Sequence, residues 1–333
     1  MSGKELTKLE IMQRLKAKRL TQREAAQMLG LSVRQVKRLY RAFREQGAKG
    51  LVSQRRGQVS NHHLPAAVVQ QALDLLQAKY VGFGPTLAHE KLTQVDKLSL
   101  SVESVRQLMI TAGLWKARRA RKIVTHQMRE RRACLGELVQ IDGSPHAWFE
   151  ERAARCTLLV FIDDATGQLL QLRFVPSESF FSYAEAARAY FERCGKPLAF
   201  YSDKHGVFRV NLPNAGAGED LTQFGRAMGE LGIQIICANT PQAKGRVERV
   251  NQTLQDRLVK ELRLQGIATW EAGNAFLPAF MADFNQRFGV APRSPRDAHR
   301  PLSAQDDLAR SLTWQEPRTL SKNLTLQFDK VVY

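Results

Sequence analysis

Three acidic side chains in this 333-residue sequence stand where phosphoryl-transfer chemistry needs them: Asp142, Asp203 and Glu248. Asp142 ends an apolar run at 138–141 that we expect to form a buried strand, and Asp203 follows a second such run at 198–202. Glu248 stands near the start of an amphipathic helix expected over 243–264. Carboxylate oxygens suit Mg²⁺, and two such ions stabilise both the attacking and the leaving oxygen of an in-line displacement. The three acids together predict a two-metal site in which each is a metal ligand and a catalytic residue.

The local setting of each acid supports this interpretation. Asp142 lies in IDGSPHAWF, where we expect a Gly-Ser-Pro turn after the strand to bring its carboxylate to the edge of a sheet. Asp203 lies in YSDKHGVF, at the end of its own strand. Glu248 falls on the border of the apolar stripe of its helix, so we expect it to point along the sheet rather than into water. Gln255, seven residues on, lies on the same edge of the helix.

Other polar residues near these acids have simpler interpretations. Asp163 and Asp164 precede a hairpin turn, where aspartate is favoured for turn chemistry, and we prefer that role to metal binding. His146 and His205 flank two of the acids, so contact with a scissile phosphate stays open. We favour polar histidines without a metal role for both.

The charge of the chain points to a polyanionic partner. Its formal net charge is +18, and residues 1–137 contain 27 Lys and Arg against 10 Asp and Glu, whereas residues 138–333 contain 23 against 22. We therefore expect residues 1–137 to bind nucleic acid and residues 138–333 to contain the candidate catalytic residues. The sequence has no bilayer-spanning apolar run and no secretory signal, and its four scattered cysteines form no CxxC pair. These features predict a cytoplasmic protein that does not bind a membrane.

Two helical modules are expected before the acids, in a helix-turn-helix domain at 1–53 and a second at 62–120. In the first, Thr21 and Glu24 form a capping box, Ser32 caps the next helix, and that helix is strongly basic. DNA binding is the favoured function, although such modules also serve in protein contacts. The stretch LSVRQVKRL at 31–39 recurs as LSVESVRQL at 100–108, which supports the second module. A basic linker at 121–135 follows. The predicted DNA-binding residues are Arg34, Gln35, Lys37, Arg38, Arg106, Arg118, Arg119, Arg121, Lys122, Lys244, Arg246 and Arg249.

A domain at 136–292 carries a different pattern. Strands are expected at 138–142, 156–163 and 168–174, then a helix at 183–193, a strand ending at Asp203, a helix at 221–231, a strand at 234–238 and the helix of Glu248. Three antiparallel strands followed by alternating helices and strands predict an RNase H-like mixed sheet. The fold class is thus α+β multidomain: an all-α tandem helix-turn-helix region, then an α/β catalytic core. In the segment 293–333, residues 324–333 alternate like one β-strand, which we interpret as the start of a truncated β-barrel.

The motifs IDGSPHAWF, YSDKHGVF, KGRVERVNQTLQ and FNQRFGVAPRSPRDAHRPL, preceded by the helical modules, resemble insertion-sequence transposases of the retroviral-integrase superfamily, and among them the ISNCY group. The resemblance covers most of residues 1–303. It implies an RNase H-like core with Asp142, Asp203 and Glu248 as the metal-binding triad. Three departures stand out: the 44 residues between Asp203 and Glu248 exceed the spacing of retroviral integrases, Gln255 replaces an often basic residue, and the zinc-binding domain is absent.

The sequence therefore predicts a DNA transposase that binds terminal inverted repeats and catalyses DNA strand cleavage and strand transfer. We expect two Mg²⁺ ions as cofactors, with Mn²⁺ as a substitute. Double-stranded DNA is the expected partner, both as element ends and as target, and joining two ends favours a homo-oligomer. The alternatives are a non-catalytic, sequence-specific DNA-binding regulator and an RNase H-like structure-specific nuclease.

Overall fold

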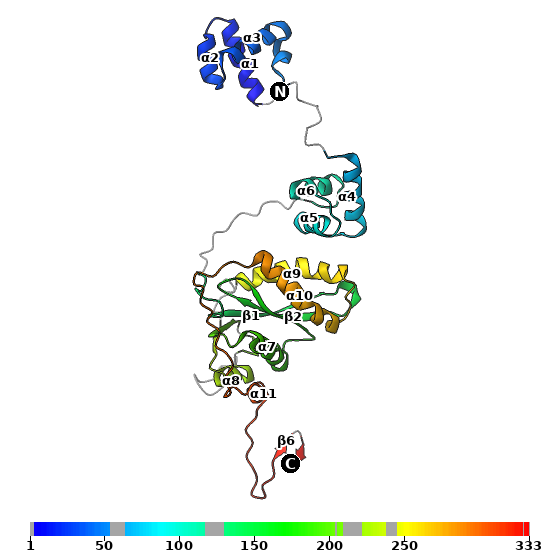
Figure 1. Ribbon diagram of the computed structural model, residues 1–333, viewed down its shortest axis with the longest axis vertical. Helices are drawn as coiled ribbons and strands as arrows, with labels where there is room; N and C mark the ends of the chain where they lie inside the picture. Colours follow the sequence, from blue (N-terminus) through cyan, green and yellow to red (C-terminus); the bar gives the residue numbers. More distant parts are fainter. Residues whose placement is uncertain are drawn as a thin grey trace. The chain divides into compact units, whose positions relative to one another are not determined.

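The computed structural model describes residues 3–53, 64–116, 130–203, 205–208, 222–237, 245–328 and 330–332. The chain divides into two compact units, Met1–Asp74 and Leu75–Tyr333, and we describe each by itself (Figure 1). The finer domain boundaries given above stay predictions.

The first unit is a cluster of short helices: α1 (Gly3–Lys16), α2 (Gln22–Leu29), α3 (Val33–Gln46) and the 3-10 helix η1 (Gly47–Leu51). The predicted capping box is present at Thr21 and Glu24, and Ser32 caps α3 by accepting from the backbone N–H of Gln35. Gly30 ends α2 with φ of 61°, a left-handed conformation that glycine adopts without strain. Apolar side chains from all four helices form one small core, made of Ile11, Met12, Leu15, Ala25, Ala26, Val36 and Leu51.

Three more helices lie within the second predicted module, 62–120: α4 (Ala66–Ala78), α5 (Pro85–Gln94) and α6 (Val102–Thr111). The boundary between the units falls within α4. Helices α5 and α6 pack on each other, and their buried residues include Leu87, Leu92 and Val105.

The centre of the second unit is a five-stranded sheet of order β3-β2-β1-β4-β5. Its strands are β1 (Val139–His146), β2 (Cys156–Asp163), β3 (Leu169–Val175), β4 (Ala199–Ser202) and β5 (Gln234–Cys237). β1, β2 and β3 are antiparallel neighbours, whereas β4 pairs parallel with β1 and β5 parallel with β4. The predicted RNase H-like mixed sheet is therefore confirmed. The expected turn after Asp142 is wrong, because β1 continues through Gly143, Ser144 and Pro145 and pairs with β2 as far as His146.

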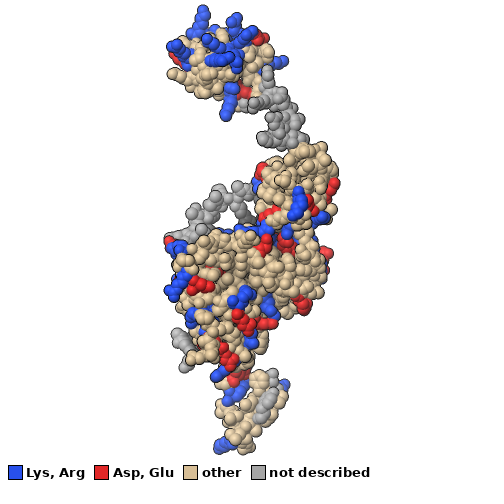
Figure 2. Space-filling model, viewed as in Figure 1, with Lys and Arg blue, Asp and Glu red and all other residues tan. Residues whose placement is uncertain are grey.

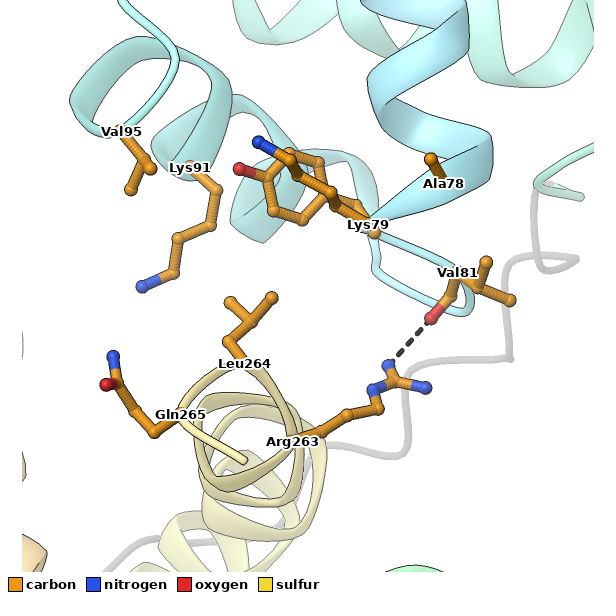
Figure 3. A pocket seen from close by; sticks show the side chains of 9 residues that line it. Ala78, Lys79, Val81, Lys91, Val95, Arg263, Leu264 and Gln265 are labelled. Carbon is orange, nitrogen blue, oxygen red and sulfur yellow. Dashed lines mark hydrogen bonds between the residues drawn. The ribbon is translucent and has the colours of Figure 1, made fainter. Parts of the chain in front are cut away.

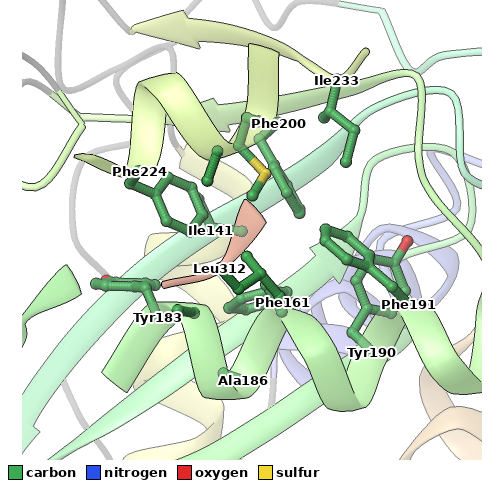
Figure 4. Close-up of a cluster of buried hydrophobic side chains, with 14 of the residues drawn as sticks. Ile141, Phe161, Tyr183, Ala186, Tyr190, Phe191, Phe200, Phe224, Ile233 and Leu312 are labelled. Carbon is green, nitrogen blue, oxygen red and sulfur yellow. The ribbon is translucent and has the colours of Figure 1, made fainter. Parts of the chain in front are cut away.

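Helices cover both faces of this sheet (Figure 1). On one face α7 (Phe180–Cys194) and α8 (Gln223–Glu230) close an aromatic core that includes Phe161, Tyr183 and Phe200 (Figure 4). On the other face α9 (Gly245–Leu264) and α10 (Trp270–Phe288) pack on alternate residues of the same strands, such as Leu158 and Val160. Successive side chains of β2 point to opposite faces of the sheet, so this one strand contributes residues to both cores.

The segment after α10 returns to the start of the core. Ala298 N donates to Leu135 O at 2.8 Å, Ser294 N donates to Ala133 O at 3.0 Å, and Leu135 pairs with Asp297 in an isolated parallel bridge. A further bridge joins Lys196 to Arg300.

The chain continues with the short helix α11 (Leu308–Ser311) and two strands, β6 (Gln327–Phe328) and β7 (Val331–Val332). The prediction of one continuous strand over 324–333 is wrong, because β6 and β7 form an antiparallel pair. The turn between them includes Lys330 with φ of 65°, a conformation that reverses the chain and interrupts the alternation.

Candidate active site on the first strand

A row of polar side chains on β1 meets helix α9. Gln140, Asp142 and Ser144 alternate with the buried Ile141 and therefore share the face of the sheet that α9 covers. Gln140 Oε1 accepts from the backbone N–H of Val247 at 3.3 Å, Asn251 Nδ2 donates to Asp142 Oδ2 at 2.8 Å, and Gln255 Nε2 donates to Ser144 Oγ at 3.1 Å. The contacts on α9 recur every four residues, so one stripe of the helix follows the polar row of the strand.

The neighbouring strand brings Asp203 to the same place. β1 and β4 run parallel, with Val139 opposite Phe200 and Gln140 opposite Tyr201. Asp142 lies two residues beyond Gln140 on β1, and Asp203 lies two residues beyond Tyr201, directly after the end of β4. Asp203 is half-buried, and its Oδ1 accepts from the backbone N–H of His205 at 3.0 Å. Two of the three predicted acids therefore lie on or just after two neighbouring parallel strands.

Glu248 lies one residue from Val247 and three from Asn251, at the α9 end that faces this pair of acids. Its side chain is exposed, and the expectation that it avoids water is wrong. The residue that turns inward is Asn251, which is 8% exposed. Among the described residues, no three His, Cys, Asp or Glu side chains are grouped closely enough to hold a metal ion. The shared role of Asp142, Asp203 and Glu248 therefore stays a prediction.

The donor set around Asp142 nevertheless fits a hard cation. Asn251 Oδ1 is buried and meets no hydrogen-bond partner among the described residues, although the amide nitrogen of the same side chain is bonded to Asp142. A buried carbonyl oxygen without a partner is costly, and amide and carboxylate oxygens are the ligands that Mg²⁺ accepts. Neither Asn251 nor the polar row was inferred from the sequence, although an asparagine inside the apolar stripe of an amphipathic helix was a usable signal.

Asp163 and Asp164 have structural roles, as the turn interpretation predicted. Asp163 is fully buried and accepts from Gly136 N, Thr166 N and Thr166 Oγ1. Burial raises the pKa of Asp163, and the hydrogen bonds from Thr166 and Gly136 oppose that rise. Asp164, also fully buried, accepts from the backbone N–H of Arg132 at 2.9 Å and from Gln140 Nε2 at 2.7 Å.

The guanidinium of Arg246 is engaged inside the protein, because Arg246 Nη1 forms an ion pair with Asp164 Oδ1. Contact of Arg246 with DNA stays a prediction, but the structure gives this residue another role: it anchors the start of α9. Arg249 is exposed.

The two histidines differ in environment. His146 lies in β1 rather than in a loop, with its ring edge-on to Trp148 at 5.3 Å. Burial and the nearby charge of Arg155 lower the pKa of His146, so its ring is neutral at neutral pH. His205 lies beside Asp203 and accepts at Nδ1 from the backbone N–H of Val207 at 3.4 Å.

The predicted DNA-binding residues of the first unit form an exposed face. Arg34, Gln35, Lys37 and Arg38 are all exposed on α3, while Val36 between them is fully buried. Lys and Arg side chains crowd this unit in Figure 2. Arg106 on α6 is paired with Glu103 at 2.6 Å. The predicted contacts at Arg118, Arg119, Arg121, Lys122 and Lys244 lie outside the described residues, as does the first part of the basic linker at 121–135.

A cavity of about 630 Å³ opens at the C-terminal end of α9, whereas Glu248 lies at the N-terminal end of this helix (Figure 3). Its lining consists of Ala78, Lys79, Tyr80, Val81, Lys91, Val95, Arg263, Leu264 and Gln265. Its cations have partners of their own: Lys91 pairs with Glu261 at 2.7 Å, Lys79 with Asp96 at 3.1 Å, and Arg263 donates to Val81 O at 2.7 Å. The cavity is therefore separate from the candidate active site. No helix in the described part of the chain is both long and apolar enough to span a membrane.

Comparisons with known proteins identify the family. A family model described as "Helix-turn-helix domain" matches residues 7–58. The Sinorhizobium fredii (strain NBRC 101917 / NGR234) protein named "Putative transposase y4bF" is 50% identical over 331 residues, which are 99% of this chain and 72% of that protein. The "Transposase for insertion sequence IS1202" of Streptococcus pneumoniae is 31% identical over 305 residues, covering 81% of this chain and 65% of that protein.

Solved structures with a similar arrangement are retroviral. A simian T-cell lymphotropic virus intasome, in complex with PP2A regulatory subunit B56 gamma, matches with 15% identity and a TM-score of 0.39, covering 66% of this chain and 80% of that chain. The HTLV-2 integrase catalytic core domain in complex with magnesium, in its dimeric form, matches with 17% identity and a TM-score of 0.36, covering 46% and 90%. The strand order and the register of the sheet, and not these two matches, define the fold of this chain.

A helix-turn-helix unit followed by a five-stranded mixed sheet defines a DNA-binding protein with a separate α/β core. The two transposases described above define its family more narrowly. The chain belongs to the transposase family, and the resemblance drawn from the sequence is confirmed.

Proposed function

We propose that this chain is a DNA transposase that cleaves and joins DNA strands at the ends of its own element, with Asp142, Asp203 and Glu248 as its cation-binding residues. The observation that carries the proposal is the parallel pairing of β1, which contains Asp142, with β4, which Asp203 directly follows, together with the packing of α9 on β1 next to Glu248. The helical modules bind the terminal inverted repeats, and the exposed basic face of α3 reads them. Synapsis of two ends requires at least two copies of the chain.

The chemistry consists of two substitutions at phosphorus. In the first, water attacks a phosphodiester at the element end, the P–O3′ bond breaks, and the leaving oxygen takes a proton to become a free 3′-OH. In the second, this hydroxyl attacks a phosphorus of target DNA, one P–O bond forms, one breaks, and the target strand is left with its own 3′-OH. A bound pair of Mg²⁺ or Mn²⁺ ions supplies positive charge for the attacking and leaving oxygens.

The residues of the chain have distinct parts in this proposal. The Asp142 and Asp203 carboxylates hold the cation site on two rigid strands. The Asn251 amide fixes the rotamer of Asp142 by its 2.8 Å hydrogen bond. Glu248, exposed at the start of α9, reaches the site by a change of rotamer, and the exposed Arg249 contacts the DNA backbone.

The test uses DNA that carries the gene's own flanks, incubated with the protein and Mg²⁺. We expect cleavage and joining at the element ends, and we expect Asp203→Asn to lower the rate by about 10²–10³-fold, the cost of removing one electrostatic stabiliser of a transition state. Asp256→Asn, an exposed acid of α9 paired with Lys260, is the matched control and keeps the full rate.

Each other outcome contradicts a different part of the proposal. Cleavage that survives in both Asp142→Asn and Asp203→Asn excludes these acids. Specific binding of element ends without any cleavage favours a DNA-binding regulator. Products that are cut and never joined favour a structure-specific nuclease.

A further inference from the structure

A buried glutamine of β1 holds the start of helix α9 against the sheet. Gln140 is fully buried, and its Oε1 accepts from the backbone N–H of Val247 at 3.3 Å. Val247 is the third residue of α9, and the first N–H groups of a helix have no acceptor within the helix itself. Because β1 and α9 are in contact (Figure 1), a strand side chain caps the helix that contains Glu248.

A buried aspartate fixes the other end of this glutamine. Gln140 Nε2 donates to Asp164 Oδ1 at 2.7 Å, and Arg246 Nη1 forms an ion pair with the same oxygen. Asp164 Oδ2 accepts from the backbone N–H of Arg132 at 2.9 Å. The consecutive α9 residues Arg246 and Val247 are therefore both tied to one buried cluster. We call Gln140, Asp164 and Arg246 the α9 clamp.

The α9 clamp differs from the contacts farther along the helix. Beyond its first turn, the buried stripe of α9 is mostly apolar, with side chains such as Leu254, Leu258 and Leu262. Apolar contact has no preferred direction, whereas a hydrogen bond weakens steeply when its angle changes. The clamp therefore fixes the rotation of the first turn of α9 more strictly than apolar packing does.

The position of Glu248 depends on that rotation. Glu248 directly follows Val247, and its side chain is exposed, so the place of its carboxylate depends on where the helix backbone lies. Gln140 lies two residues before Asp142 on the same strand. One buried side chain therefore links the strand of one proposed catalytic acid to the helix of another.

We propose that Gln140 is a positioning residue of the DNA cleavage reaction and acts through the α9 clamp. It sets the start of α9, and with it Glu248, against the strand that contains Asp142. This inference rests on the proposed function, because it gives the clamp a part in the reaction assigned to these acids. Reacting groups need to be held to within about 0.5 Å, and a displacement of about 1 Å costs about 100-fold in rate.

The experiment compares the same substitution at two buried glutamines of one sheet. Gln140→Met nearly conserves the volume of the side chain and removes both of its hydrogen bonds. Gln171→Met is the matched control, because Gln171 lies on β3, is 7% exposed and accepts from Arg193 Nη1 at 3.0 Å. Hydrogen exchange resolved to single residues detects the clamp without any reaction. We expect the Val247 N–H to exchange faster in Gln140→Met and at the wild-type rate in Gln171→Met.

Cleavage of element-end DNA tests the positioning role. The single-turnover rate constant is measured with protein in saturating excess over DNA, so that a loss of folded protein or of DNA affinity does not change it. We expect Gln140→Met to lower this rate constant about 10–100-fold, the cost of misplacing a reacting group. Gln171→Met keeps the wild-type rate constant.

Arg246→Met opens the clamp from its other side and provides a second test. The Arg246 side chain is partly exposed, so this variant perturbs the core less than Gln140→Met does. We expect faster exchange at Val247 and a lower rate constant. The double variant Gln140→Met/Arg246→Met then loses less than the product of the two single losses, since both changes act on one clamp. A loss equal to that product would overturn the clamp as a unit.

The remaining outcomes separate this inference from the function on which it rests. If wild-type protein cleaves and Gln140→Met keeps the wild-type rate constant, Gln140 does not position the reaction and the inference is overturned. Unchanged exchange at Val247 in Gln140→Met overturns it as well. If the wild-type protein does not cleave element-end DNA, the proposed function fails, and the positioning role fails with it.

Discussion

Four aspartates of the sheet fall into two groups, which burial distinguishes. Asp163 and Asp164 are fully buried and bonded to backbone N–H groups and side chains of neighbouring segments. Asp142 within β1 and Asp203 just after β4 are half-buried. The first pair holds the fold, and the second pair belongs to the proposed cation site.

At the residue scale, the pair Asp164 and Arg246 gives a test of stability. We expect Asp164→Asn to lower the free energy of unfolding by about 3 kcal/mol, because it leaves a guanidinium facing a buried site without its counter-charge. Denaturant unfolding followed by circular dichroism measures the change.

The control for this variant is Asp256→Asn. Asp256 also pairs with a cation of α9, Lys260, but its side chain is 57% exposed. Exposed pairs of this spacing contribute about 0.3–0.5 kcal/mol, so this variant stays close to wild type. Equal losses in the two variants would show that burial of Asp164 does not matter.

The sequence could single out Asp142 and Asp203, because each follows an apolar run, and their role stays a prediction. It could not predict that Asn251 is the hydrogen-bond partner of Asp142. The two residues are 109 apart in the chain, and only the packing of α9 on β1 brings them together.

At the element scale, one acidic side chain of α5, Glu90, contacts both α9 and α10. Glu90 accepts from Arg257 Nη1 and Nη2 at 2.7 and 2.9 Å and from Arg287 Nη1 at 2.8 Å. Burial raises the pKa of Glu90, but the hydrogen bond and charge of Arg257 and the charge of Arg287 exceed that effect and leave the pKa lowered. A single carboxylate therefore joins three helices.

We expect Glu90→Gln to destabilise the second unit by about 2 kcal/mol, because two part-buried guanidinium groups then face each other without a counter-charge. Because the folded pKa of Glu90 is lowered, the wild-type contribution is complete above the usual glutamate value of about 4.5 and is lost as pH falls through the lower folded pKa. The thermal unfolding midpoint, followed from pH 7 to pH 3, measures both effects.

Glu103→Gln is the control at this scale, since Glu103 is 59% exposed and pairs with Arg106 within α6. Its midpoint follows the wild-type profile. If the unfolding midpoint of Glu90→Gln falls as much between pH 7 and pH 3 as that of the wild type, Glu90 is not the source of the pH dependence.

Elements with local signals could be predicted from the sequence. The capping box of α2 and the serine cap of α3 involve residues three apart, so the sequence alone contains both partners. The contact of Glu90 with Arg257 joins residues 167 apart, and nothing in the pattern of either helix pairs them. The length of β1 was also missed, because its pairing with β2 carries the strand through Gly143 and Pro145.

At the scale of the whole molecule, the uneven charge predicts how DNA binding depends on salt. Each cation that contacts a phosphate contributes about 0.9 to the slope of log affinity against log salt concentration. We expect the triple variant Arg34→Ala/Lys37→Ala/Arg38→Ala to bind element-end DNA more weakly and to reduce that slope by about 2–3. Fluorescence anisotropy at several KCl concentrations measures both quantities.

A charge-matched control removes three exposed cations of the second unit: Arg296→Ala, Arg310→Ala and Lys322→Ala. We expect it to keep most of the wild-type slope. Equal slopes for the two triple variants would mean that net charge, and not the face of α3, governs binding. The charge division and the basic face of this helix were both visible in the sequence, and the fold confirms that Arg34, Gln35, Lys37 and Arg38 are exposed while Val36 is buried.

The segment after α10 ends beside the strand entry, where Ser294 and Ala298 bond to Ala133 and Leu135. A stretch whose two ends meet can be excised and spliced into another chain with short joints. Segments before residue 133 and segments after residue 298 therefore leave the core at one place, and the chain can be lengthened on either side without passing through the sheet.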